Sequence, residues 1–243
     1  GEEGVISFLR RSEEVAAGVP GVVDAAFASW IPLLGGHEGM AYRLEGMPPM
    51  ADEDLPRARV YDVSPGYFET LGVPLVGGRL FSESDTEDAD QVLVVNEAFQ
   101  RANWPDGSAV GRTLAVPPGN WSDEEMRYRI VGVVADVEPL TPGEPPEPEA
   151  YRTNRQYARI FPYLVVRARG EPVAVAQRVR EALLAGVSPD LGVTVQGSMT
   201  ALMDRYLVRP RFNVTLIATF AGAALLLTLV GIYGVLAYAV AQR

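Results

Sequence analysis

The sequence predicts an α+β fold in which two αβ halves flank an inserted β-rich subdomain, followed by a transmembrane helix. Three observations lead to this prediction. A helix stop, a turn and a strand follow one another at residues 16–27 and again at 184–195. Short strand-like runs separated by acidic or proline-rich loops fill the middle, and an uncharged apolar run closes the chain. We expect the two αβ halves to pack into one layer.

These patterns divide the chain into four predicted segments. The first αβ half takes residues 1–59, the β-rich subdomain 60–155, the second αβ half with a stalk helix 156–211, and the transmembrane helix 212–241. The chain begins at Gly1 and stops directly after the apolar run, so we expect it to be part of a longer protein.

The two αβ halves follow the same plan. Apolar residues at helical spacing from Val5 to Ala16 predict a helix that ends at the sequence GVPG, before a strand at residues 22–30. In the second half, residues 161–169 predict a strand, and a helix begins at Pro172 and ends at Gly186. Residues 191–195 predict a further strand, which gives β-α-β order.

The middle segment alternates apolar runs with turns. Strands are predicted at "ARVYDV", "QVLVVN", "YRIVGVVADV" and "EAYR". Asn96 is the expected N-cap of one helix. In the glycine-rich stretch 63–81, Ser64 is the expected start of a short helix and Gly72 its end, and Pro74 with Gly77 and Gly78 is expected to form a turn. These glycines favour a scaffold over a ligand-binding loop.

The apolar run near the end predicts a membrane span. No charged residue lies between Arg211 and Arg243. As a helix rising about 1.5 Å per residue, Val214 to Val240 would reach roughly 40 Å, which exceeds a hydrocarbon core of about 30 Å. Small residues on this helix are candidates for packing against neighbouring helices: Ala218, Gly222, Ala223, Gly231 and Gly234. The arginines before the span, taken alone, would place the large domain in the cytoplasm.

Composition excludes several classes of function. The formal net charge is -10, which argues against a nucleic-acid partner. All 21 basic residues are arginine, so these residues hold no phosphate-loop lysine and no lysine base. Cysteine is absent and His37 is the only histidine, which excludes thiol catalysis and zinc sites of the Cys/His kind. We expect no cofactor in this chain.

Polar motifs offer weaker candidates. The acidic run "SESDTEDAD" lacks the glycine and the final glutamate of a calcium loop, so a solvated acidic turn is favoured. His37 lies between glycines and is expected in a surface loop. Arg79 and Arg112 each follow a glycine, and structural ion pairs are favoured over ligand carboxylates. Asp123, with two glutamates after it, is expected in a polar loop rather than across a cleft.

Four motifs in order resemble one family. They are "VSPGYFETLGVPLVGGRLFSESD", "VLVVNEAFQRANWPDGSAVGRTL", "YRIVGVVADV" and "RPRFNVTLIATFAGAALLLTLVGIYGVLAYAVAQR". Together they resemble the MacB-like periplasmic core domain followed by the first helix of the FtsX-like permease domain, of the duplicated orphan-permease type.

The resemblance implies an ABC-type permease subunit in the bacterial inner membrane, with residues 1–211 outside the cytoplasm. It implies a porter-like αβ layer with a β-rich insertion, and no enzymatic activity of the subunit itself. Implied partners are a separate ABC ATPase subunit, other permease helices or a second permease copy, and membrane lipid. The ATPase would drive export or efflux through the segment from Ser198 to Arg209. Candidate coupling residues in and after that segment are Met199, Leu202, Met203, Tyr206 and Pro210.

Two other functions stay open from the sequence. One is a membrane-anchored periplasmic module that binds a ligand or a protein without transport. The other is a membrane-tethered hydrolase that uses His37 or paired carboxylates. Further membrane spans beyond Arg243 would favour the permease over the anchored module.

Overall fold

A computed structural model describes residues 2–31, 38–48, 50–119, 122–137, 144–157, 163–204 and 218–232. The chain divides into two compact units, Gly1–Ser198 and Met199–Arg243. Each unit is described by itself.

The first unit contains one ten-stranded mixed sheet and four α-helices in its described part. The strands are β1 (Val22–Ala28), β2 (Glu38–Ala41), β3 (Arg43–Leu44), β4 (Arg57–Val63), β5 (Leu75–Gly78), β6 (Val92–Asn96), β7 (Thr113–Val116), β8 (Met126–Val134), β9 (Glu149–Thr153) and β10 (Tyr163–Ala168). The helices are α1 (Glu2–Ala17), α2 (Tyr67–Leu71), α3 (Glu97–Asn103) and α4 (Pro172–Gly186), with a short 3-10 helix at Asp52–Asp54. The predicted α+β class is confirmed.

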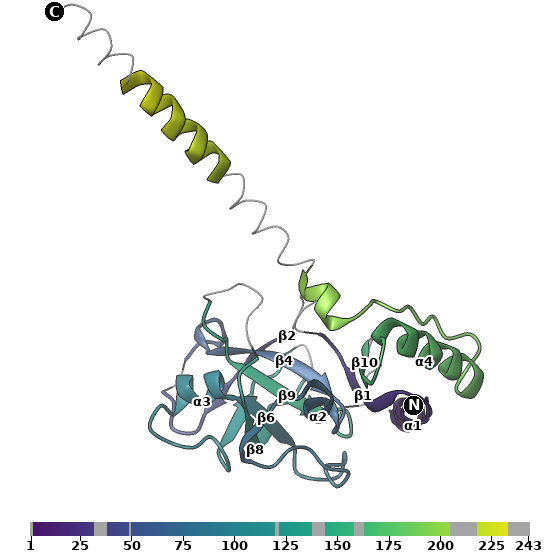
Figure 1. Cartoon of the computed structure of the whole chain (residues 1–243). Coiled ribbons are helices and arrows are strands. Elements are labelled where there is room, and N and C mark those ends of the chain that lie inside the picture. The colour runs from purple at the N-terminus through teal and green to yellow at the C-terminus, as the bar shows by residue number, and fades with distance from the viewer. Residues whose placement is uncertain are drawn as a thin grey trace, which may run out of the picture. The chain divides into compact units, whose positions relative to one another are not determined.

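The sheet joins strands that are far apart in the sequence. Its order is β10-β1-β4-β9-β6-β8-β7-β3, with β2 paired to β4 and β5 paired to β8. The pairs β4/β9 and β6/β8 are parallel, and the other pairs are antiparallel. Figure 1 shows β1 and β10 at one end of the sheet beside α1 and α4, whereas α3 lies toward the other end.

Strand β6 lies near the centre of the sheet, and this position explains why its sequence is apolar. All five of its residues are buried. Leu93 and Val95 belong to a core cluster with Phe99 of α3, and Val92 and Val94 belong to a second cluster with Phe68 of α2. A strand covered on both faces reads as a continuous apolar run instead of an alternating one.

The helices α1 and α4 share a third core cluster with β1 and β10. Ala16 and Val19 pack there with Val175, Val179 and Leu183 of α4. The two helices approach closely at Gly186 of α4, because an added Cβ there would lie 3.2 Å from Val15 Cγ2 of α1. As predicted, Pro172 opens α4. The cap is Glu171, whose carboxylate accepts hydrogen bonds from the N–H groups of residues 173 and 174.

Three local predictions are wrong. Residues 191–195 form no strand, because Leu191 and Val193 pack against the α4 cluster and Val193 O accepts a bond from Arg180 Nε at 3.0 Å. The β-α-β order therefore stops after α4. Ser64 does not cap α2, since Gly66 is the N-cap and makes no side-chain bond. The predicted C-terminal stop is confirmed, with Gly72 at φ 72°.

The third error concerns Gly77 and Gly78, which belong to strand β5 and not to a turn. Gly78 has φ 74°, and a Cβ there would lie 2.2 Å from Val131 O. A Cβ on Gly132 of β8 would lie 2.1 Å from Arg79 O. The two backbones thus approach so closely that neither position admits a side chain, which is a recurring reason for glycine inside a strand.

The second unit contains helical residues 199–204 and 218–232 among those described. No helix in the described ranges is long and apolar enough to cross a membrane. The predicted segment boundaries stay predictions, although β4 begins at Arg57 and so runs across the boundary placed between residues 59 and 60.

Candidate functional site

The predicted coupling residues lie partly within the described second unit. Met199, Leu202 and Met203 fall at the i, i+3 and i+4 positions of the helical segment 199–204, where Leu202 is 7% exposed and Met203 41%. Tyr206 and Pro210 lie outside the described residues. The coupling role of all five stays a prediction.

Helix 218–232 exposes every one of its side chains. Leu227 is 74% exposed and Val230 68%, so the apolar surface of this helix faces no protein within its own unit. Among the predicted packing residues, Ala218, Gly222 and Gly231 lie on this helix, and Gly234 lies outside the described residues. Thr228 Oγ1 donates to Ala224 O at 2.8 Å and so needs no external acceptor.

The αβ elements meet the rest of the sheet where β1 joins β4, at residues 27–29 and 62–64, which we call the junction. The ladder between these strands holds only the pair Ala28 and Val63. Backbone and hydroxyl groups extend it: Ser29 N donates to Asp62 O at 2.8 Å, and Asp62 N donates to Ser29 Oγ at 2.9 Å. The Ser29 hydroxyl thus adds a hydrogen bond between two strands that share only one backbone pair.

Ser64 forms two further hydrogen bonds across the junction, both with Phe27. Its N–H donates to Phe27 O at 3.0 Å, and its hydroxyl accepts from Phe27 N at 2.9 Å. Ser64 is 1% exposed, so water does not compete for these bonds. This reciprocal pairing explains why serine stands before Pro65 although it caps no helix.

Glu13 reaches the junction from α1. Its carboxylate accepts a hydrogen bond from Phe27 N at 3.4 Å. Burial raises the pKa of Glu13, and the nearby Ser64 hydroxyl and the charge of Arg155 oppose that rise without cancelling it. A carboxylate of α1 therefore contacts strand β1 directly.

A buried ion pair lies beside the junction. Arg152 of β9 donates to both carboxylate oxygens of Asp62 on the adjacent strand β4, at 2.6 and 2.9 Å. Arg152 is 0% exposed and Asp62 3%. The guanidinium also lies 4.3 Å from the ring centroid of Tyr157, and its Nη2 lies 3.8 Å from Glu38 Oε2. Paired and hydrogen-bonded in this way, the two charges are held away from water.

A tyrosine cluster surrounds a second buried carboxylate. Glu149 accepts a hydrogen bond from Tyr151 at 2.6 Å and a longer one from Tyr61 at 3.5 Å, whose ring stacks on that of Tyr151. Burial raises the pKa of Glu149, which is 8% exposed. Burial also raises the pKa of Tyr61, Tyr67 and Tyr151, so these phenols stay protonated and able to donate.

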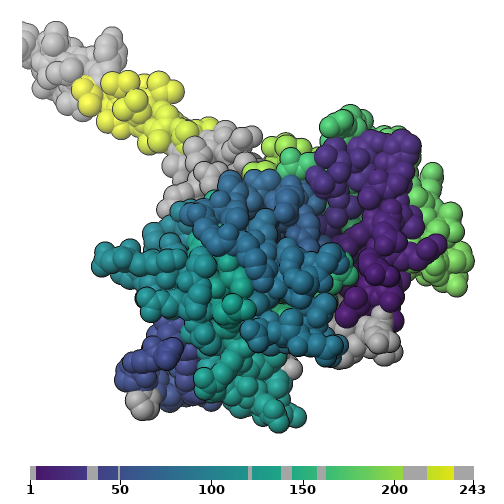
Figure 2. All heavy atoms as spheres, turned by 90° about the horizontal axis from the view of Figure 1, so that it is seen from below, coloured from purple at the N-terminus to yellow at the C-terminus, as the bar shows by residue number. Residues whose placement is uncertain are grey.

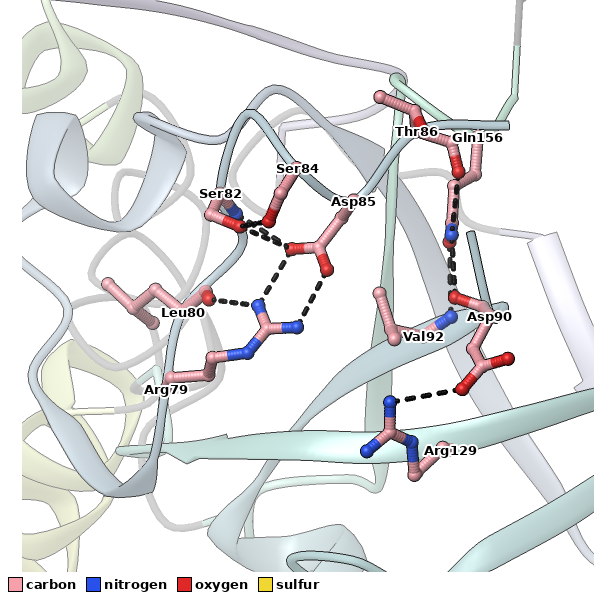
Figure 3. A network of polar contacts seen from close by, with 10 residues as sticks. All are labelled: Arg79, Leu80, Ser82, Ser84, Asp85, Thr86, Asp90, Val92, Arg129 and Gln156. Carbon is pink, nitrogen blue, oxygen red and sulfur yellow. Dashed lines mark hydrogen bonds and ion pairs between the residues drawn. The ribbon is translucent and has the colours of Figure 1, made fainter. Parts of the chain in front are cut away.

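The acidic run 82–90 forms turns with most of its residues exposed, as predicted, but Asp85 is buried and bonded (Figure 3). Arg79 donates to both oxygens of Asp85 at 2.7 Å, and Ser82 N donates to the same carboxylate at 2.8 Å. Burial opposes the charge of Asp85, but the bonds from Arg79 and Ser82 outweigh it and lower its pKa. The prediction of a structural ion pair for Arg79 is correct.

The far end of this loop is fastened by a glutamine. Gln156 Nε2 donates to Asp90 O at 2.8 Å and to Thr86 O at 3.2 Å, while its Oε1 accepts from Val92 N at 3.1 Å (Figure 3). The loop is therefore fixed at one end by Arg79 and at the other by Gln156.

Two other polar candidates, Arg112 and Asp123, lie in the described part of the chain. Arg112 lies with its guanidinium 5.8 Å from the Trp104 ring centroid. Asp123 lies in an exposed bend. Within the described ranges, no group of three or more His, Cys, Asp or Glu side chains is placed to hold a metal ion. His37 lies outside those ranges.

Sequence reasoning misses the residues that the structure joins most tightly. In the sequence, Arg152 and Asp62 stand only near the ends of predicted strands, and Glu13 only as a polar residue of a helix. One signal in the sequence could have indicated the Arg152–Asp62 pair: each residue is a charge of opposite sign in an otherwise apolar strand. A charge on a buried strand needs a partner.

Comparisons with known proteins agree with these motifs. The chain matches the family of MacB-like periplasmic core domains over residues 10–185. The macrolide export ATP-binding/permease protein MacB of Aggregatibacter actinomycetemcomitans is 26% identical over 87 residues, which are 36% of this chain and 12% of that protein. The uncharacterized ABC transporter permease YvrN of Bacillus subtilis (strain 168) is 28% identical over 75 residues, which are 31% of this chain and 17% of that protein. The match thus spans less than a fifth of either relative.

Two solved structures are also similar. The periplasmic region of MacB from Actinobacillus actinomycetemcomitans has a TM-score of 0.48 and 15% identity, covering 72% of each chain. The extracellular domain of the noncanonic ABC-type transporter YknZ from Gram-positive bacteria has a TM-score of 0.47 and 13% identity, covering 72% of this chain and 81% of that one.

Proposed function

The chain belongs to the family of MacB-like periplasmic core domains, and from that premise we propose that it is the extracytoplasmic domain and first following membrane helix of an ABC-type permease subunit. The observation that carries the proposal is the family match over residues 10–185 together with an uncharged apolar run at 212–241. A core domain followed by such a run fits a membrane-anchored permease better than a free binding protein.

The role we propose is mechanical: ATP hydrolysis in the cytoplasm changes the position of the outer domain and so drives export or efflux. The continuous sheet supports this role, because α1 and α4 pack on β1 and β10, and the junction ties β1 to β4. A displacement of the helices would reach the β-rich part through the backbone and serine hydroxyl hydrogen bonds of the junction.

The ATPase is proposed to be a separate subunit. Residues 1–243 contain no lysine, so they hold no phosphate-loop lysine, and no cofactor is proposed for them. The name of the first relative includes both ATP-binding and permease functions, whereas that of the second includes only a permease. The location we propose is the bacterial inner membrane, with residues 1–211 outside the cytoplasm.

Lipid and other permease helices are the proposed neighbours of the apolar run. Helix 218–232 exposes apolar side chains such as Phe220 and Leu227, which are 67% and 74% exposed. Lipid tails would cover these side chains. At Gly222 and Gly231, an added Cβ would meet no atom within 4 Å, so these positions are open for a neighbouring permease helix or a second copy.

Pro210 is proposed to set the stiffness between the stalk segment and the membrane helix. Proline removes a helical hydrogen bond and kinks or breaks a helix, so Pro210→Ala is expected to stiffen this connection and to raise the outer-domain movement obtained per ATP hydrolysed. The measurement compares ATP turnover with a fluorescence reporter on the outer domain, in the full-length subunit reconstituted with its ATPase. Pro189→Ala, at an exposed loop position, is the matched control and is expected to behave as wild type. Unchanged coupling in Pro210→Ala would show that the stiffness idea is wrong.

Association with an ATPase tests the proposed class directly. The full-length protein, purified from its native membrane, is expected to carry an ABC ATPase and to hydrolyse ATP in nanodiscs. A protein that integrates into the membrane but binds no ATPase would favour the anchored binding module. A hydrolase activity that is lost in His37→Ala would favour the third candidate.

A further inference from the structure

We propose that Arg167 of β10 is a positioning residue that fixes the angle between the αβ elements (α1, β1, β10 and α4) and the β-rich part of the first unit. It does so by bonding to the carboxyl end of α2, at a distance from the junction. The inference rests on the proposed function only for its meaning in transport, because a fixed angle would pass a displacement of α1 and α4 on to the β-rich part.

Strands β1 and β10 lie between helices on both of their faces. On one face, Ala25 of β1 and Val166 of β10 pack against the cluster formed by α1 and α4. On the other face, Ala26 and Ala28 of β1 pack with Phe68 of α2. Successive side chains of a strand point to opposite faces, which explains this division. Figure 1 shows α2 on one side of β1 and α1 with α4 on the other, and Figure 2 shows the purple N-terminal residues between blue and green ones.

Helix α2 joins the β1 and β10 pair to the β-rich part. It stands between β4 and β5 in the chain, so it belongs to that part. It can lie close to β1 because Ala26 and Ala28 present only methyl groups, and both are 0% exposed. Phe68 of α2 lies in the same core cluster as Val92 and Val94 of β6. One short helix therefore packs on β1 and on the centre of the sheet.

The carboxyl end of α2 receives one of its hydrogen bonds from β10. The Gly72 N–H donates to the carbonyl oxygens of Phe68 and Glu69. The next carbonyl, Thr70 O, accepts from Arg167 Nε at 2.9 Å. The last carbonyls of a helix have no partner within it, so a donor from another element supplies what α2 lacks. The guanidinium lies close over this end, because an added Cβ on Gly72 would lie 2.6 Å from Arg167 Nη2.

The place of this bond along β10 lets it oppose rotation at the junction. Ala28 forms the one ladder pair with Val63 of β4. In the ladder between β1 and β10, Ala28 faces Tyr163, whereas Asp24 faces Arg167. Four residues of strand separate these two places, which corresponds to about 13 Å. Two strands that share one ladder pair can pivot there, and a bond at this distance from the pivot resists that rotation.

Arg167 is suited to fix a position without being needed for folding. The residue is exposed, so water competes for its hydrogen bond and the net contribution of the bond to stability is small. The apolar packing of α2 on Ala26 and Ala28 does not depend on the guanidinium. Loss of the bond is therefore expected to widen the range of angles while the first unit stays folded.

The test is the distance distribution between spin labels at Gln177→Cys of α4 and Ala102→Cys of α3, two exposed positions, in the full-length chain without an ATPase. Pulsed electron spin resonance measures it. Arg167→Ala is expected to broaden the distribution, and Arg167→Lys to restore much of the wild-type width, since an ammonium group can also donate to Thr70 O. Arg169→Ala removes another exposed arginine two residues later and is the matched control, with the wild-type width expected.

Four results would overturn the inference. They are a wild-type width in Arg167→Ala, a width in Arg167→Lys equal to that in Arg167→Ala, a broadened distribution in Arg169→Ala, or a urea midpoint clearly lower in Arg167→Ala than in Arg169→Ala. The last would show that Arg167 holds the fold instead of the angle. The measurement needs no ATPase, so its failure can be told apart from a failure of the proposed transport role.

Discussion

Replacing Arg152 with alanine is expected to lower the free energy of unfolding of the first unit by about 3 to 5 kcal/mol. The change leaves Asp62, which is 3% exposed, as an unpaired charge inside the sheet. Asp62 would lose two hydrogen bonds at 2.6 and 2.9 Å, and Tyr157 would lose the guanidinium 4.3 Å from its ring centroid. Removing one member of a buried pair costs more than the pair itself contributes.

Urea unfolding with linear extrapolation measures this loss. Arg127→Ala is the matched control, because its partner Glu125 and Arg127 itself are 39% and 75% exposed in their side chains, and it is expected to cost less than about 1 kcal/mol. The double change Arg152→Met with Asp62→Leu is expected to recover much of the stability. Equal losses for Arg152→Ala and Arg127→Ala would contradict the proposed burial of this pair.

Gly78→Ala is expected to be the most damaging single methyl addition in the β-rich part, with a loss of more than about 4 kcal/mol. Two costs add at this position. The residue has φ 74°, which L side chains adopt only with strain, and the new Cβ would lie 2.2 Å from Val131 O on the paired strand β8. Strand β5 would have to move away from β8 to admit it.

Gly111→Ala separates these two costs. Gly111 has φ 84°, but an added Cβ meets nothing within 4 Å, so only the backbone strain of about 1 to 2 kcal/mol is expected. The difference between the two urea midpoints therefore measures the close approach of β5 and β8. Equal midpoints for Gly78→Ala and Gly111→Ala would show that the two strands do not approach so closely.

Several elements can be predicted because their signal is local. The apolar run of β6, the N-cap bond from Phe99 N to Asn96 Oδ1 at 2.9 Å, and the start of α4 at Pro172 all follow from residues within one turn or one strand. The αL conformation of Gly72 belongs to the same class. Each of these features depends on chemistry between near neighbours in the chain, which a single sequence displays.

The elements that failed depend on partners far away in the sequence. Leu191 and Val193 read as a strand, but their side chains pack on α4 and no neighbouring strand pairs with them. Gly78 reads as a turn because the close approach of β8, more than 50 residues later, leaves no local trace. Ser64 reads as a cap because its true partner, Phe27, stands 37 residues earlier in the chain.

The candidate site divides in the same way. The stalk positions Met199, Leu202 and Met203 follow from helical spacing alone, and their role in coupling stays a proposal. The junction and the side chains bonded to it could not be predicted, since these bonds join residues 13, 27, 62 and 152 across three strands and a helix. A single sequence indicates which residues carry charge but not which of them meet.

The central claim is that ATP hydrolysis moves the first unit as a body relative to the second. Residues 1–243 contain no cysteine, so labels can be placed on Gln177→Cys of α4 and Asp204→Cys of the helical segment 199–204, both exposed positions. A control pair at Gln177→Cys and Ala102→Cys lies wholly within the first unit.

The deciding measurement is the distance distribution of each pair by pulsed electron spin resonance, in the full-length subunit reconstituted with its ATPase. The account predicts that the distribution between residues 177 and 204 shifts when the ATPase is trapped with vanadate, while that between residues 177 and 102 stays the same. Identical distributions between residues 177 and 204 with and without trapping, in a complex that hydrolyses ATP, would contradict it.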